Sequence, residues 1–268
     1  MGVISIIVFS LILVLDGCSA AKVPTGPPKP ELSELEFNWG RIPQNSIVTH
    51  VYNLSNAGGD SIIIEELRPH CGCTKAPLST NVVHAGESIP IELRFNSKGY
   101  RNKARKSASL RLKSGEEVIN NRLVFNAYVD TSSILFSDGQ IEVSMPIVEF
   151  TDSIESIEIG LKNRMAASRN LIIVDYQSDR IEVSWEEKKL KPKDSVRLKI
   201  TRKIPSKELF ASITMEMEGY DNSRITIPVS GINRRATRLP SVKKVSRSQK
   251  SSSNIPWLDD PNYRGRPR

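Results

Sequence analysis

The sequence predicts an all-β protein made of two tandem immunoglobulin-like β-sandwich domains. Three observations carry this prediction. Apolar and polar residues alternate over most of the chain, no window has helical periodicity, and one pattern of strands and turns occurs twice. The 268 residues are 38% hydrophobic and 25% charged, which is a globular composition, and only 6% are aromatic, so we expect aliphatic cores.

Residues 1–21 are expected to be an export signal. Residues 3–15 form an apolar run of about 20 Å as a helix, shorter than the roughly 30 Å of a bilayer core. The run leads to Cys18 in a sequence that resembles a bacterial lipobox, where Cys18 would be diacylated, although Asp16 departs from that motif. Ordinary signal cleavage after residue 20 or 21 and a retained anchor are the alternatives. All three interpretations place the chain outside the cytoplasm. We expect it at the bacterial cell envelope, on the periplasmic side or the outer surface, where a lipid on Cys18 would tether it to the membrane.

Residues 22–34 contain four prolines and are expected to form a stiff, extended linker between the signal and the first domain. Residues 35–130 are expected to form the first sandwich. Its inward-facing side chains recur at every second position, as in Val48, His50, Tyr52 and Leu54, and in Ile89, Ile91, Leu93 and Phe95. On this face we expect His50 to be a hydrogen-bonded histidine at the edge of the core.

Residues 131–232 are expected to form the second sandwich, because they repeat the pattern of the first. The sequence Leu54-Ser55-Asn56 corresponds to Leu161-Lys162-Asn163, and Gly86 to Ile89 corresponds to Lys193 to Val196, both at an offset of 107 residues. The expected inward sets of this copy are Ile181/Val183/Trp185, Val196/Leu198/Ile200, Ile213/Met215/Met217 and Ile225/Ile227/Val229.

Four segments of the first copy resemble one bacterial family. They are Phe37 to Ile42, His50 to Gly58, Cys71-Gly72-Cys73-Thr74 and Ala85-Gly86-Glu87, and in this order they resemble the family named Domain of Unknown Function 1573 over about residues 35–130. The resemblance implies an immunoglobulin-like β-sandwich, usually in exported proteins or lipoproteins, and no established activity. Trp39 and Ala85 depart from the family pattern. The second copy has no Cys-Gly-Cys, and residues 175–179 lie in its place.

Cys71 and Cys73 support several hypotheses. A disulfide can join residues i and i+2 when a glycine bends the backbone between them, and an exported compartment favours oxidation. Two thiolates with His70, and with His84 from the following loop, could instead hold copper or zinc. Reduced, buried packing residues and a redox pair are the remaining alternatives. Apart from the copper or zinc of this alternative, we expect no cofactor.

No catalytic motif is recognised in the sequence. There is no serine elbow, metalloprotease helix, phosphate loop or dinucleotide fingerprint, and no acidic pair in a setting for acid–base chemistry. We therefore predict that the protein is not an enzyme.

A basic stretch between residues 98 and 113 contains no acidic residue. It is expected to form a loop leading into a strand, either as a solvated hairpin or as a surface for an anionic partner. Its members are Lys98, Arg101, Lys103, Arg105, Lys106, Arg111 and Lys113. With Tyr100 as its single aromatic residue, the stretch does not favour nucleic-acid binding.

Residues 233–268 are expected to be a disordered basic tail. They carry ten basic and two acidic residues, a formal charge of +8 that equals the charge of the whole chain. The remainder is therefore formally neutral. Trp257, Leu258 and Tyr263 form an apolar island in the tail that could be a docking motif.

Together these features predict a non-catalytic binding or scaffolding protein of the cell envelope, anchored through Cys18. We expect it to engage a protein partner, with strand addition at an exposed sheet edge as the first mechanism to test. One alternative is a metal- or thiol-handling module at the Cys-Gly-Cys motif. The other is a spacer that presents its cationic tail to an anionic envelope polymer.

Overall fold

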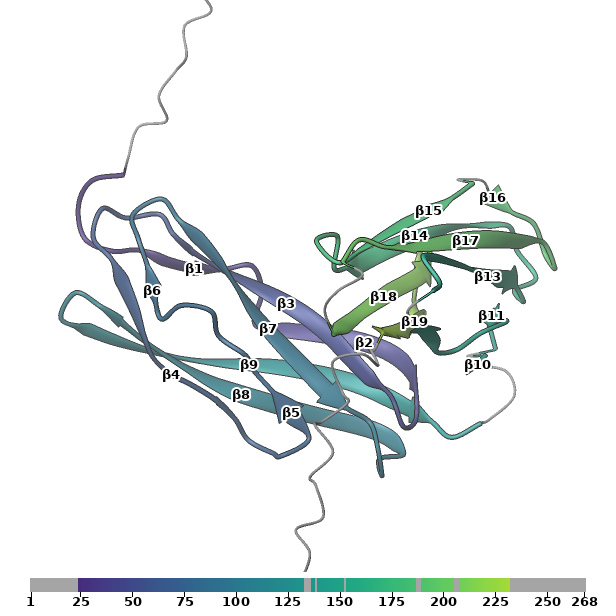
Figure 1. The fold of residues 1–268 in the computed structure, drawn as a ribbon, viewed down its shortest axis with the longest axis horizontal. Coiled ribbons are helices and arrows are strands. Elements are labelled where there is room, and N and C mark those ends of the chain that lie inside the picture. Colours follow the sequence, from purple (N-terminus) through teal and green to yellow (C-terminus); the bar gives the residue numbers. More distant parts are fainter. Residues whose placement is uncertain are drawn as a thin grey trace, which may run out of the picture. The chain divides into compact units, whose positions relative to one another are not determined.

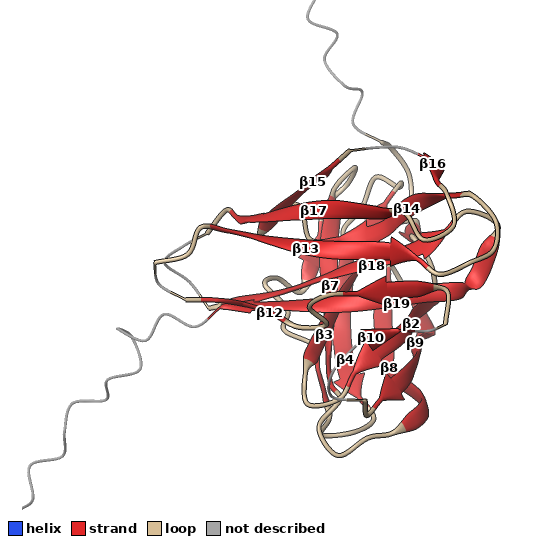
Figure 2. Ribbon diagram, turned by 90° about the vertical axis from the view of Figure 1, so that its right-hand side faces the viewer, coloured by secondary structure: helices blue, strands red, loops and turns tan. Residues whose placement is uncertain are grey.

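The computed structural model describes residues 24–132, 136–137, 139–151, 153–186, 189–204 and 208–231. These residues form strands and loops without a helix, as Figure 2 shows, which confirms the all-β prediction. Accordingly, this part of the chain contains no helix long and apolar enough to cross a bilayer. The expectations for residues 1–21 with Cys18, and for the tail with Trp257, Leu258 and Tyr263, lie outside the described residues.

The first sandwich packs a sheet of four strands against five strands of a second sheet (Figure 1). The four-stranded sheet has the order β1 (Pro30–Leu32), β3 (Ile47–Asn56), β7 (Ser88–Asn96) and β5 (Thr74–Lys75). The facing strands have the order β2 (Glu36–Pro43), β9 (Glu117–Asp130), β8 (Asn102–Ser114), β4 (Ile62–Pro69) and β6 (Val82–Val83).

The second sandwich repeats this strand order, with β10 (Phe136–Ser137) as an addition at one edge. Its first sheet continues with β11 (Ile141–Val143), β13 (Ser156–Asn163), β17 (Ser195–Arg202) and β15 (Ile181–Trp185). The facing strands are β12 (Val148–Phe150), β19 (Tyr220–Gly231), β18 (Leu209–Met217), β14 (Arg169–Tyr176) and β16 (Lys189–Leu190). The repeat inferred from the sequence is therefore present in the topology, including a parallel pair in each copy, β2 with β9 and β12 with β19.

One buried asparagine organises the same turn in both copies. The Asn56 Oδ1 accepts the N–H of Gly58 at 3.0 Å and its Nδ2 donates to the Val83 carbonyl at 3.1 Å. In the second copy, the Asn163 Oδ1 accepts the N–H of Met165 at 2.9 Å and its Nδ2 donates to the Leu190 carbonyl at 3.0 Å. Both residues are buried, so each amide replaces water for backbone groups that have no strand partner.

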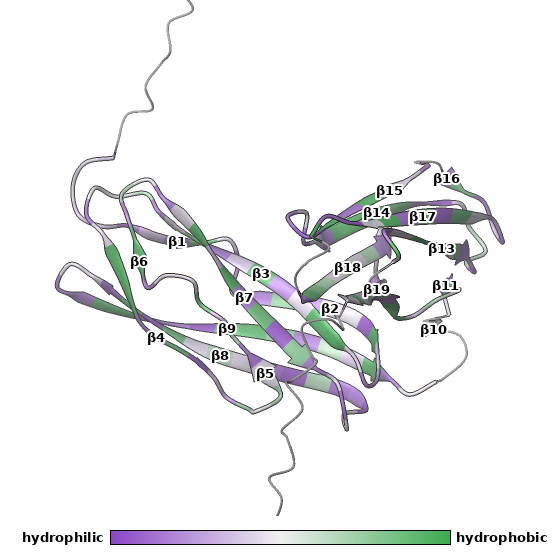
Figure 3. Cartoon of the chain, in the orientation of Figure 1, coloured by the Kyte–Doolittle hydropathy of each residue, from purple (hydrophilic) through white to green (hydrophobic). Residues whose placement is uncertain are grey.

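Hydrophilic and hydrophobic residues alternate along the strands, as the purple and green bands of Figure 3 show. The buried apolar side chains form two separate cores, one in each sandwich. On β8 the alternation separates a buried apolar side from an exposed basic one. Ala104, Ala108, Leu110 and Leu112 face the core, whereas Lys103, Arg105, Arg111 and Lys113 are exposed. The inward sets expected for the second copy are buried as well, except that Trp185 is half-buried at the margin of the core.

The expectation of a separate linker over residues 22–34 is wrong from residue 24 onward. Strand β1 pairs with the end of β3, the Ala57 N–H donates to the Lys29 carbonyl at 2.9 Å, and the Gly59 N–H donates to the Gly26 carbonyl at 3.0 Å. Prolines suit this position because an edge strand has N–H groups that no neighbour needs. Of the four prolines in this segment, Pro30 lies in the edge strand itself.

Lys193 provides a test of the repeat. Its φ of 70° lies in the left-handed region, and the equivalent residue of the first copy, Gly86, has a φ of 72°. A residue with a side chain is less stable than glycine by about 1–2 kcal/mol in this region. Glycine also raises the conformational entropy of the unfolded chain, which offsets part of this difference. We therefore expect Lys193→Gly to raise the free energy of unfolding by about 0.5–1 kcal/mol. Denaturant unfolding measures the change. The control is Lys162→Gly, within β13, which should lower the free energy of unfolding because glycine weakens a strand. A lower free energy of unfolding in both variants would contradict the equivalence of Lys193 with Gly86.

Candidate functional site

The two sandwiches meet where β19 pairs in parallel with β2, opposite Arg41. The backbones approach so closely that a Cβ at Gly40, whose φ is 65°, would lie 2.0 Å from the Arg224 carbonyl oxygen. The Thr226 hydroxyl donates to the Trp39 carbonyl at 2.6 Å. The described residues of both sandwiches fall within one compact unit. The close approach of the two backbones requires glycine at position 40.

Side chains of the second sandwich cover an unpaired part of β3. The Thr49 N–H donates to the Ser212 hydroxyl at 2.8 Å, and the Thr49 carbonyl accepts from Trp39 Nε1 at 3.4 Å and from Gln177 Nε2 at 3.5 Å. The Ser212 N–H in turn donates to Gln177 Oε1 at 2.7 Å. Thr49 is fully buried, so these side chains take the place that a neighbouring strand would occupy.

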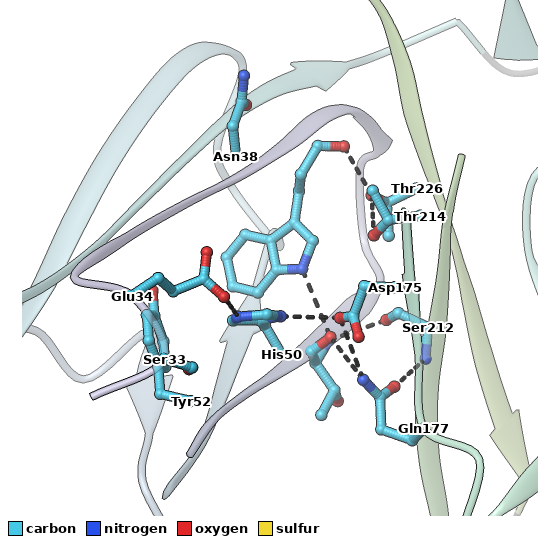
Figure 4. A network of polar contacts seen from close by, with 12 residues as sticks. Ser33, Glu34, Asn38, His50, Tyr52, Asp175, Gln177, Ser212, Thr214 and Thr226 are labelled. Atoms are coloured by element: carbon cyan, nitrogen blue, oxygen red, sulfur yellow. Dashed lines mark hydrogen bonds and ion pairs between the residues drawn. The ribbon is translucent and has the colours of Figure 1, made fainter. Parts of the chain in front are cut away.

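His50 connects the two sandwiches next to this contact (Figure 4). Its Nδ1 lies 2.8 Å from Asp175 Oδ2 in the second sandwich, and its Nε2 lies 3.0 Å from Glu34 Oε1. The ring stacks on Phe37 with centroids 3.6 Å apart. Because a carboxylate accepts at each ring nitrogen, the arrangement favours the doubly protonated imidazolium. The sequence predicted a hydrogen-bonded histidine here but not these partners.

The pKa of His50 is raised above its usual range. Burial on its own would lower this pKa, but the hydrogen bonds to Asp175 and Glu34, together with the two negative charges, outweigh it. Tyr52 contacts the ring edge-on, and burial raises the pKa of its own phenol, so Tyr52 stays neutral. The two carboxylates thus favour the protonated form of His50 in a buried setting.

A second group of ion pairs joins the outer face of the four-stranded sheet to the second sandwich. Arg180 of the second sandwich contacts both carboxylate oxygens of Glu92 and donates to the Phe210 carbonyl at 2.7 Å. Arg94 binds the same carboxylate. Burial would raise the pKa of Glu92, but the two guanidinium groups hold it below its usual range. Glu92 therefore stays ionised inside the junction.

Sequence reasoning missed the residues of the second sandwich that make these contacts. Asp175, Gln177 and Arg180 lie at or beside the turn between β14 and β15, which is the position that Cys71 to Cys73 occupies in the first copy. The sequence contained one sign of their role: the second copy has polar residues in this turn where the first copy has Cys71 to Cys73.

Two hollows open beside the junction and differ in charge. One of about 620 Å³ includes the carboxylates of Glu34, Glu36 and Asp175 in its lining. The other, of about 550 Å³, includes four cations in its lining and no acidic residue; they are Arg41, Lys103, Arg105 and Arg224. Asn38, Asn126 and Arg224 belong to both linings, so the hollows adjoin. Acidic and basic side chains thus gather in different hollows, although residues 1–232 have no formal net charge.

Cys71 and Cys73 are joined by a disulfide with their Cα atoms 5.2 Å apart, in the turn between β4 and β5. The exposed Gly72 bends the chain between them. Sulfurs bonded to each other are not thiolate ligands. His70 contacts the hydroxyls of Ser107 and Ser109, and His84 contacts the hydroxyl of Ser61. Within the described ranges no three His, Cys, Asp or Glu residues are grouped closely enough to hold a metal ion.

The basic stretch is divided between a loop and the exposed side of β8. Lys98 and Arg101 lie in the loop before β8. Arg105 forms an ion pair with Glu36 at 2.6 Å, and Arg111 forms one with Glu65 at 2.9 Å. The Lys106 ammonium lies 4.6 Å from the centroid of the Tyr100 ring. Lys103 and Lys113 are exposed on the strand. The stretch is therefore not one uniform surface, and Lys103 and Arg105 belong to the basic hollow.

Fold and junction together define a protein of two linked immunoglobulin-like β-sandwiches. Residues 30–129, which hold the first sandwich, match the model of the family described as Protein of unknown function (DUF1573), the family that the sequence motifs resemble. None of the curated protein sequences matches the chain.

Similar solved structures include a protein of unknown function from Porphyromonas gingivalis W83, with 11% identity, coverage of 75% of this chain and 98% of that chain, and a TM-score of 0.34. The periplasmic chaperone SfaE has 11% identity, coverage of 76% and 100%, and a TM-score of 0.30. The ASH/PapD-like domain of human CEP192 has 9% identity, coverage of 48% and 99%, and a TM-score of 0.34. Similarity at this level says nothing about function.

The His50 contacts predict a pH dependence of stability. A raised folded-state pKa stabilises the protein fully below the unfolded value of about 6.5, and this contribution is lost as the pH rises through the folded pKa. We expect the thermal midpoint of the native chain to fall over this range. His50→Gln should abolish that part of the fall, whereas His84→Gln, at an exposed histidine, should retain it. Equal profiles for the native chain and His50→Gln would contradict the account.

Proposed function

We propose that the chain is a non-catalytic protein of the bacterial cell envelope, lipid-anchored at Cys18, that binds an extended segment of a partner protein along β15. The apolar run before Cys18 supports export, and so does the disulfide, because disulfides persist in oxidising compartments. A binding or scaffolding role agrees with the immunoglobulin-like fold of the two sandwiches and with the match to a family of unknown function. The observation that carries the proposal is the free edge of β15.

β15 differs from the other strands at the sheet edges. Within the described residues, β1, β5, β6, β10 and β16 have two or three residues each, whereas β15 has five and contains neither a bulge nor a proline. The longer strands that extend beyond these short ones are protected in other ways. β4 and β14 contain bulges, β7 contains Pro90, and the open part of β3 is covered by the second sandwich. Among the strands that end a sheet, β15 is thus the longest, and it has none of these protections.

The backbone of β15 alternates between its neighbour and the open side. The Lys203 N–H donates to the Arg180 carbonyl, so residues 180, 182 and 184 direct their backbone groups to β17. The intervening residues then direct theirs to the open side. The Ile181 N–H is taken by the Gln177 carbonyl at 3.1 Å. The N–H groups of Val183 and Trp185 remain for an added strand.

Partly exposed apolar side chains beside the open edge of β15 could contact a bound segment. Ile173 and Tyr176 of β14 and Trp185 of β15 are partly exposed while packed against the second core. A segment lying along β15 would direct every second side chain toward them. Backbone pairing would then supply affinity, and pockets for alternate side chains would supply selectivity. The outward residues Glu182 and Ser184 are exposed, and Glu182 favours a cation on the opposite strand.

The thiol- or metal-handling alternative has less support. The sulfurs of Cys71 and Cys73 are paired, and His70 and His84 are hydrogen-bonded to serines in the first sandwich. The spacer alternative depends on the tail, which lies outside the described residues.

A selection from a random peptide library tests the proposal. We expect enriched peptides with alternating apolar residues whose binding slows hydrogen exchange of the Val183 and Trp185 amides. Because Trp185 would be covered on binding, Trp185→Ala should weaken these peptides by about tenfold, which corresponds to about 1.4 kcal/mol of lost contact.

Val118→Ala, at an exposed apolar residue of the first sandwich, is the matched control and should leave affinity unchanged. Peptides that bind without protecting the two amides would overturn the proposal. So would a selection that enriches no binder in the native chain.

A further inference from the structure

The basic hollow has a regular floor made by three neighbouring strands. One cross-strand row contains Arg41, Tyr128 and Lys103, and the next contains Asn38, Asn126 and Arg105. Arg224 of β19, from the second sandwich, adds a wall, together with Asn222. The hollow is therefore complete only when both sandwiches are joined.

Three of its four cations are held in place by carboxylates that do not line the hollow. Arg41 pairs with Asp130 at 2.9 Å, Arg105 with Glu36 at 2.6 Å and Arg224 with Glu216 at 2.7 Å. Such pairing fixes a guanidinium group and leaves other N–H donors available, because each guanidinium carries five. Lys103 is exposed and forms no ion pair with any carboxylate in the described part of the chain. It is therefore the cation that is free to pair with a ligand.

The remaining lining favours a polyhydroxylated molecule. Asn38, Asn126 and Asn222 contribute amides that both donate and accept, as hydroxyl groups require. The Tyr128 side chain is 38% exposed, with the Arg41 guanidinium 4.6 Å from its ring centroid. Stacked nucleobases need aromatic platforms in series, and this hollow has a single ring. Cations, amides and one ring together match sugar units that carry negative charges.

We propose that this hollow binds an anionic polysaccharide. Lys103 and the guanidinium groups pair with its carboxylates, and the asparagine side chains bind its hydroxyls. The site is separate from the β15 edge, so it adds a ligand to the proposed function and does not depend on that function.

The test is calorimetric titration of the full chain with an oligogalacturonate of six sugars. Binding is expected, and it should weaken as salt rises because charges are paired. Lys103→Gln should weaken it about tenfold, the loss of one charge-assisted contact. Lys113→Gln is the matched control, because Lys113 is exposed on the same strand but lies outside the hollow. It should bind like the native chain. An uncharged maltohexaose should bind far more weakly.

Three results would overturn the proposal. Absence of binding would do so directly. An equal loss in Lys103→Gln and Lys113→Gln, or no loss in either, would assign the attraction to diffuse charge, including the ten basic residues of the tail. Equal affinity for a single-stranded oligonucleotide, with the same dependence on Lys103, would assign the hollow to nucleic acid. Both variants lie at exposed lysines, so loss of folding does not confuse the comparison.

Discussion

The backbone of β3 imposes the constraint on which the rest of the structure depends. An edge strand needs partners for its outward N–H and C=O groups. β1 supplies them only at the end of β3, and at Thr49 they come from Ser212 and Gln177 of the second sandwich. His50 and Glu92 then complete the contact with buried ion pairs, which would be costly to leave unpaired. The two sandwiches therefore form one body, and the basic hollow exists because they do.

The two sandwiches are copies of one architecture that differ at one turn. Both copies share strand order, parallel pairs and the buried asparagine, at Asn56 and Asn163. They differ in the turn that follows β4 and β14. In the first copy the turn is closed by the Cys71–Cys73 disulfide, and in the second Gln177 and Arg180 use it to bind the preceding sandwich. One topological position thus stabilises a loop in one copy and holds the domains together in the other.

The sequence predicts those features that depend on local periodicity. Alternation identified the core faces, and the offset of 107 residues identified Asn163 as the counterpart of Asn56. The junction was beyond such reasoning, because its partners, such as His50 and Asp175, lie more than a hundred residues apart and no spacing connects them. Composition also misled. The expected linker contains the edge strand β1, and two residues of the basic stretch, Arg105 and Arg111, are paired with acids.

The central claim is that the two sandwiches behave as one body, and amide ¹⁵N relaxation tests it most directly. The measurement yields a rotational correlation time for the residues of each sandwich separately. Because the junction is buried and the second sandwich pairs the backbone of Thr49, the account predicts the same correlation time for both, that of a body containing both domains. Two different, shorter times, each typical of a domain of about 100 residues tumbling on its own, would contradict it.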